Sequence, residues 1–184
     1  MYYFTKYQQK LRLYNNQIDY LEFEGTMIDY LNTLPLFNDF HCPYPSWCQL
    51  IKDVTKNQKQ FYQLPYFNRQ SLWTPMGTAS SNQTQWLNLA QLQKIKQAQG
   101  KTYLIYLEHN IHVPYDAKTI RAHLKKSAQI IALFEQVCQT NYYFQNTQFT
   151  RHNPLLTSYY KQTKSAPIIN ITPETILHSL LSKI

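Results

Sequence analysis

The chain has 184 residues, the usual length of one domain with its own hydrophobic core. Its 18 lysines and arginines outnumber 10 aspartates and glutamates, which gives a formal net charge of +8 and the composition of a soluble basic globular protein. Only 3 residues are glycine, so phosphate-binding loops of the GxGxxG type, or of the GxxxxGK type followed by Ser or Thr, are excluded.

The N-terminal half of the chain predicts short elements separated by irregular segments. Residues 17–23 read as a strand that Gly25 ends, and a short helix follows through Leu31. Apolar residues at helical spacing predict a helix in 47–63, and a second helix is predicted at 88–99, with Gly100 as its left-handed cap. Proline, glycine and small polar residues predict irregular chain at 35–46 and 74–85.

The C-terminal half contains the strongest patterns. Residues 101–111 predict a central strand that is covered on both faces, because they form a continuous aromatic and β-branched run. Residues 117–139 predict a long helix, capped by Asp116, with a buried stripe of Ile120, Leu124, Ala128, Ile131 and Phe134 or Cys138. A last helix is expected from Thr172, with Pro173 in its first turn. The fold class is therefore α+β or α/β, one compact domain with a small sheet flanked by helices.

Charge is unevenly distributed along this domain, which we take to span residues 1–184. Residues 1–39 are the more acidic part, and residues 100–171 are the basic part. The 16 tyrosines give the surface polar aromatic rings, which suit a contact surface, although an AT-rich genome would favour the same residues through its codons.

Localisation is predicted from three absences in the sequence. The 3 cysteines form no disulfide framework, which favours a reducing compartment. The first residues carry scattered charges and no apolar core, so they do not read as a signal peptide. No apolar run approaches the roughly 18 residues of a membrane span. We therefore expect a cytoplasmic protein that does not enter a membrane.

Glu22 and Glu24 are the candidate catalytic and metal-binding residues. On a strand, side chains two residues apart point to the same face, so both carboxylates can meet one cation. A pair of this kind can bind Mg²⁺ for phosphoryl transfer. Mg²⁺ is therefore the expected cofactor only if the protein is an enzyme, and the alternative interpretation is an exposed strand face with two solvated glutamates.

The basic half provides a candidate nucleic-acid interface. Cations recur at three- and four-residue spacing on the predicted helix and continue beyond it, interleaved with tyrosines. Lysine and arginine neutralise phosphates, and exposed aromatic rings stack on bases. The candidate residues are Lys118, Arg121, Lys125, Lys126, Tyr142, Tyr143, Arg151, Asn153, Lys161 and Lys164. The alternative is a solvated basic face that keeps the protein soluble.

Two histidines, His109 and His112, follow the predicted central strand after Glu108. Residues three apart on a straight strand point to opposite faces, so this spacing is poor for a shared metal ion. A single imidazole that acts on a phosphate, or as an acid or base, is a more favourable interpretation than a metal site, and an ordinary half-exposed turn is more favourable still.

Residues 100–160, from GKTYLIYLEHNI to the turn Arg151-His152-Asn153-Pro154, resemble the replicase domain of small theta-replicating plasmids. That family belongs to the archaeo-eukaryotic primase-polymerase class, and the resemblance implies a sheet flanked by helices with a cleft for template and nucleotide. Glu22 and Glu24 alone could replace the family's paired aspartates, and Gly100–Tyr103 stands where its strand carries histidines. A binding remnant, or a fragment of a larger initiator, therefore fits better than an active polymerase.

Three functional hypotheses follow from these patterns. The first is a nucleic-acid-binding protein of a plasmid or phage, such as a primase-like replication factor. The second is a small inhibitor of a host nucleoprotein machine, of the anti-CRISPR kind, which would bind a nucleic-acid-handling protein and no free nucleic acid. The third is a metal-dependent phosphoryl-transfer enzyme that uses Glu22 and Glu24.

Overall fold

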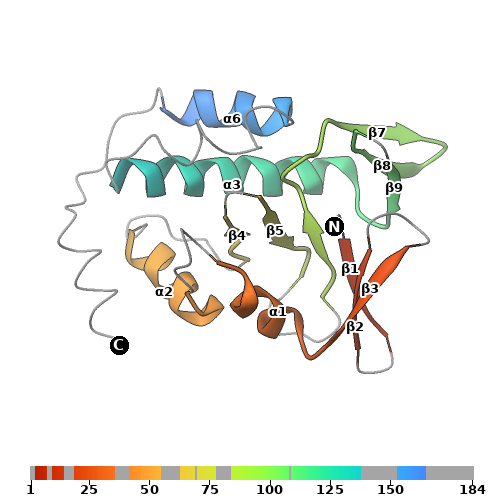
Figure 1. The fold of residues 1–184 in the computed structure, drawn as a ribbon. Helices are drawn as coiled ribbons and strands as arrows, with labels where there is room; N and C mark the ends of the chain where they lie inside the picture. The colour runs from red at the N-terminus through yellow and green to blue at the C-terminus, as the bar shows by residue number, and fades with distance from the viewer. Residues whose placement is uncertain are drawn as a thin grey trace.

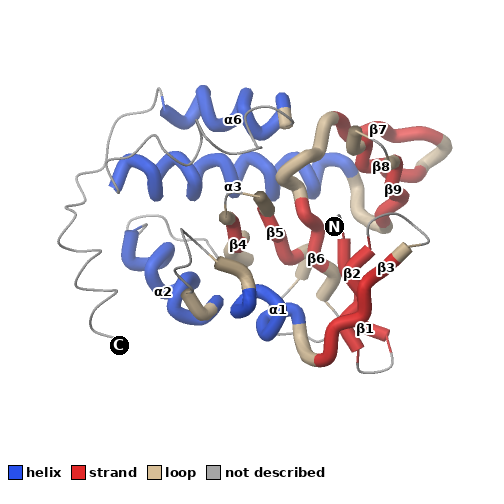
Figure 2. The backbone as a smooth tube through the Cα atoms, in the orientation of Figure 1, coloured by secondary structure: helices blue, strands red, loops and turns tan. Residues whose placement is uncertain are grey.

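A computed structural model describes residues 3–7, 10–14, 19–35, 42–54, 63–68, 70–77, 84–107, 109–137 and 153–164. Helices and strands alternate along these ranges in a mixed order (Figures 1 and 2). The elements are β1 Tyr3–Tyr7, β2 Lys10–Tyr14, β3 Tyr20–Glu24, α1 Met27–Thr33, α2 Tyr44–Val54, β4 Tyr66–Phe67, β5 Leu72–Pro75, β6 Trp86–Asn88, β7 Lys94–Ala98, β8 Lys101–Ile105, β9 Asn110–Val113, α3 Ala117–Val137 and α6 Pro154–Lys164.

The strands form two antiparallel sheets within the described part of the chain. The larger sheet has six strands in the order β3-β2-β1-β6-β5-β4, so β3 and β4 are its edges. The smaller sheet has three strands in the order β7-β8-β9. Helices pack against these sheets, and the predicted α+β class is confirmed.

Helices cover both faces of the β4-β5-β6 part of the larger sheet. On one face, Tyr30 of α1 contacts Trp73 of β5, with ring centroids 6.1 Å apart. On the other face, Phe134 of α3 contacts Phe67 of β4 at 5.7 Å. Helix α6 packs on the outer side of α3, as Figure 1 shows. The layers are therefore α1, then the sheet, then α3, then α6. Helix α2 lies beside the β4 edge and also packs on α3, because Trp47 contacts Phe67 of β4 at 4.8 Å and Phe134 of α3 at 5.3 Å.

Helix α3 confirms the strongest helix prediction. The Asp116 carboxylate accepts a hydrogen bond from the backbone N–H of Thr119 at 2.7 Å, so the predicted cap is present. The predicted stripe is buried, because Ile120, Leu124, Ala128, Ile131 and Phe134 are all at most 2% exposed. Cys138 lies outside the described residues.

The predicted helix at 88–99 is wrong. Residues 86–88 form β6 and residues 94–98 form β7, with a turn between them. Gln99 and Gly100 both have positive φ, 51° and 72°, and close the two-residue hairpin that pairs Ala98 with Lys101. Gly100 is therefore left-handed as predicted, but in a β-hairpin turn, where this geometry matches the twist of the flanking strands.

The predicted strand at 101–111 is correct in its first half. Residues 101–105 form β8, the central strand of the smaller sheet, and a turn closed by a bond from Tyr106 N–H to the His109 carbonyl leads into β9. Only one face of β8 is covered, because Thr102 and Leu104 are buried and Tyr103 and Ile105 are half-buried. The expectation of cover on both faces is wrong.

The remaining predictions give the correct type of element, but the residues at which the elements begin or end differ in the structure. The strand predicted at 17–23 is β3, Gly25 follows it with φ +128°, and the short helix is α1. The helix predicted from Trp47 is α2, which begins three residues earlier at Tyr44. The loop predicted at 74–85 begins inside β5. The helix expected from Thr172 lies outside the described residues.

Candidate nucleic-acid interface

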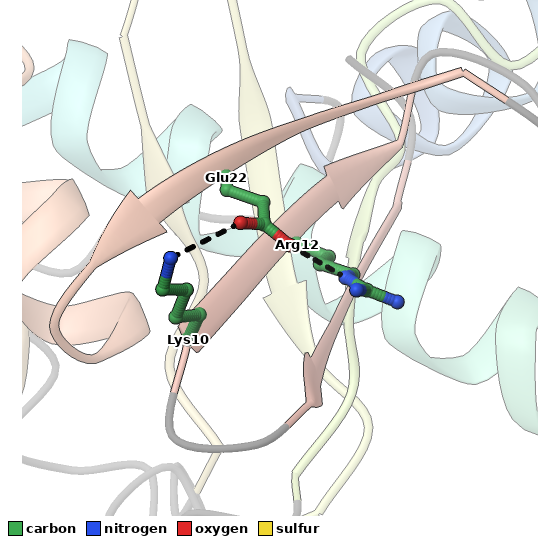
Figure 3. Close-up of polar contacts among 3 residues, drawn as sticks. All are labelled: Lys10, Arg12 and Glu22. Carbon is green, nitrogen blue, oxygen red and sulfur yellow. Dashed lines mark hydrogen bonds and ion pairs between the residues drawn. The ribbon is translucent and has the colours of Figure 1, made fainter.

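Glu22 and Glu24 lie on β3, at the edge of the larger sheet, and share a face as predicted. Across the neighbouring strand, Arg12 Nε lies 3.1 Å from one Glu22 oxygen and Lys10 Nζ lies 3.4 Å from the other (Figure 3). Both carboxylate oxygens of Glu22 are therefore held by cations of β2.

These contacts determine the chemistry of Glu22. The hydrogen bond from Arg12, and then the one from Lys10, lowers the pKa of the Glu22 carboxyl. A divalent cation would have to displace both of these positive groups. Over the described ranges, no three side chains of the metal-ligating types come together. The geometry at β3 therefore supports a cross-strand ion pair better than the Mg²⁺ site that the spacing predicted.

The predicted cations of α3 form a surface stripe. Lys118, Arg121 and Lys125 are exposed, and their three- and four-residue spacing places them on one face of the helix. The single acidic residue of α3, Glu135, is buried, where it accepts a hydrogen bond from the Tyr160 hydroxyl of α6. We call Lys118, Arg121 and Lys125 the α3 stripe. Its nearest acid along the chain is the cap residue Asp116, which interacts with Lys118 at the start of the helix.

Lys126 lies beside the α3 stripe but differs from it. It is half-buried, and this burial lowers the pKa of its ammonium to about 8. Near pH 8 the side chain is therefore charged in only part of the molecules. Lys126 is a weaker phosphate ligand than the three exposed cations.

Asn153 does not belong to the exposed surface, which corrects its prediction as a nucleic-acid contact. It is 0% exposed. Its amide donates a hydrogen bond to the Leu89 carbonyl at 2.6 Å, and its side-chain oxygen accepts one from Leu156 N–H at 2.8 Å. Asn153 therefore caps α6 and ties this helix to the chain after β6.

The other predicted contacts are only partly described. Lys161 is exposed on α6. Lys164 is the last residue of α6, and its side chain is not among those described. Tyr142, Tyr143 and Arg151 lie outside the described residues. The structure therefore brings together the three residues of the α3 stripe and does not test the rest of the predicted tyrosine-rich surface.

A second basic surface, on the smaller sheet, was not predicted. Lys94, Lys96 and Lys101 are exposed on β7 and β8, around the half-buried Tyr103. The sequence does contain an indication of this surface. Charged and apolar residues alternate in Lys94-Ile95-Lys96, as on a strand with one buried face, and of the three only Ile95 is buried. The leucines upstream have helical spacing, so the sequence predicted a helix here instead of a strand. Figure 2 shows the smaller sheet beside the start of α3.

Two buried polar atoms of α3 lie one helical turn apart. His123 Nδ1 and Ser127 Oγ have no hydrogen-bond partner in the part of the molecule that the structure describes. Burial, and then the nearby charge of Lys126, lowers the pKa of His123. This histidine is therefore held in its neutral form.

The lowered pKa of His123 predicts that the unfolding free energy falls as the pH drops below about 7. In the unfolded chain His123 titrates near its ordinary pKa of about 6.5, so the unfolded state binds more protons in this range. His123→Gln should flatten this pH dependence of the unfolding free energy, measured by urea denaturation. His112→Gln, at an exposed position, is the control and should leave the dependence unchanged. Equal pH dependence in the wild type and His123→Gln would contradict this account.

None of the helices that the structure describes is both long enough and apolar enough to cross a bilayer. Comparisons with family models, with curated proteins and with solved structures gave no match to this chain.

Proposed function

We propose that this protein binds nucleic acid through the α3 stripe. The observation that carries the proposal is the exposure of Lys118, Arg121 and Lys125 on one face of α3, a helix whose own acid, Glu135, is buried. Cations that reach phosphates release counterions, and this release provides most of the affinity in sequence-independent binding. The exposed face of α3 suits this task, because the Asp116 carboxylate at the start of the helix interacts with Lys118 and leaves Arg121 and Lys125, further along the helix, to meet phosphates.

The cellular role within this proposal is replication of a plasmid or phage in the cytoplasm. Its support is the resemblance of residues 100–160 to plasmid replicase domains. Polymerising chemistry is not part of the proposal, because Arg12 and Lys10 hold the carboxylate of Glu22. Binding and positioning of nucleic acid is the function that these residues favour.

A direct binding measurement tests the proposal. Fluorescence anisotropy of short labelled DNA and RNA, single- and double-stranded, should give a Kd of about 10 μM or tighter at about 50 mM salt. No binding to any of the four at that salt concentration would contradict the proposal. An acidic protein partner, steered by the same positive field, would then be the better account of the α3 stripe.

A further inference from the structure

One face of the smaller sheet is built around Tyr103. The register places Lys96 directly opposite Tyr103, and Tyr103 directly opposite His112, so the three side chains form a row across β7, β8 and β9. The next row, Ile95, Leu104 and Ile111, is buried in the core. Because neighbouring rows point to opposite faces, the row of Tyr103 faces away from the core.

Positive charge surrounds this ring. Lys94 lies two residues from Lys96 on β7, and Lys101 lies two residues from Tyr103 on β8, so both share the outward face. The three strands contain no aspartate or glutamate. Tyr103 packs on the His112 ring, with centroids 5.6 Å apart and planes tilted by 52°. This contact holds the tyrosine ring in place on the sheet.

We propose that this face binds unpaired bases of single-stranded nucleic acid, with Tyr103 as the stacking residue. Lys94, Lys96 and Lys101 contact the phosphates on either side, and the face of a base packs on the tyrosine ring. In a duplex the bases already stack on one another, so the ring gains contact only with a single strand. The inference rests on the proposed function and deepens it, because it names the nucleic acid that is bound.

The aromatic ring distinguishes this ligand from an acidic protein. A carboxylate-rich surface would be attracted by the three lysines alone, since their charge acts without regard to the tyrosine. A single strand uses both the charge and the ring, because each of its nucleotides carries a phosphate and a flat base. The dependence of binding on Tyr103 is therefore the property to measure.

The test compares Tyr103→Leu and Tyr103→Phe with the wild type. Loss of one stacked base costs about 1–3 kcal/mol, so Tyr103→Leu should weaken single-strand binding by about 5- to 150-fold, measured by anisotropy. Tyr103→Phe keeps the ring and should bind like the wild type. Duplex affinity should be the same in all three proteins. Tyr20→Leu, which removes an exposed tyrosine from β3, is the matched control and should have no effect.

The outcomes separate this inference from the proposed function. Thermal melting first establishes that each variant is folded. If folded Tyr103→Leu binds single strands as tightly as the wild type does, base stacking on this sheet is wrong, and the α3 stripe can still account for binding. If Tyr103→Leu and Tyr103→Phe lose affinity equally, the ring does not stack on a base. If the wild type binds no nucleic acid, both proposals fail.

Discussion

Reversing two charges of the α3 stripe, in the double variant Arg121→Glu and Lys125→Glu, should weaken nucleic-acid binding by at least about tenfold at about 100 mM salt. Each substitution removes a phosphate contact and puts a carboxylate in its place. Both side chains are exposed, and substitutions at such positions usually change the unfolding free energy by less than about 0.5 kcal/mol. Anisotropy measures the affinity, and urea denaturation shows whether the stability is retained.

A matched control exists on α2. Lys52 is also an exposed lysine on a helix, and α2 meets α3 at Phe134, nine residues beyond the last residue of the α3 stripe. Lys52→Glu therefore makes the same charge change as Lys125→Glu at a distant place. If Lys52→Glu and Lys125→Glu weaken binding equally, the affinity depends on net charge alone and the α3 stripe has no special role.

Asn153→Ala should lower the unfolding free energy by about 2–3 kcal/mol. Alanine removes the cap of α6, which is worth about 1 kcal/mol, and leaves the buried Leu89 carbonyl without its hydrogen bond, at a further cost of about 1–2 kcal/mol. Urea denaturation measures this loss. Under conditions where the variant is folded, its affinity for nucleic acid should equal that of the wild type.

Asn153→Ser separates the two contributions of this residue. Serine is also a good helix cap, but its short side chain does not replace the bond to the Leu89 carbonyl. It should therefore recover about 1 kcal/mol relative to alanine. A stable Asn153→Ala that loses nucleic-acid affinity would instead place Asn153 on the binding surface and contradict its buried position.

Local patterns predicted those elements whose residues interact within a few positions of one another. The start, cap and buried stripe of α3 follow from spacing and from Asp116, so they could be predicted from the sequence. The same is true of the break at Gly25 and of the central strand β8. These features depend on propensity, capping and periodicity, which the sequence displays directly.

Long-range contacts account for the predictions that were wrong. The cap residue Asn153 bonds Leu89, which is 64 positions away, so its burial is invisible to a local pattern. The partners of Glu22 lie on β2, ten and twelve residues earlier. The chain at 88–99 forms strands because the turn at Gly100 pairs β7 with β8, and this pairing overrides the helical spacing of the leucines.

The candidate site likewise has one part that local spacing predicts and one part that depends on the pairing of strands. Spacing alone predicted the α3 stripe, because three cations on one helix face follow from the helical period. The row of Lys96, Tyr103 and His112 depends on the register of three strands, which only the structure provides. Register places a lysine beside an aromatic ring that lies seven residues away in the sequence.

The salt dependence of nucleic-acid affinity tests the central claim most directly. Wild type and the Arg121→Glu, Lys125→Glu variant are compared over about 50–300 mM salt, as log K against log salt concentration. Each phosphate contact contributes about 0.9 to the slope for duplex DNA, so the wild type should show a steep slope and the variant a slope smaller by about 2. Wild-type binding that is independent of salt, or equal slopes for the two proteins, would contradict phosphate binding by the α3 stripe.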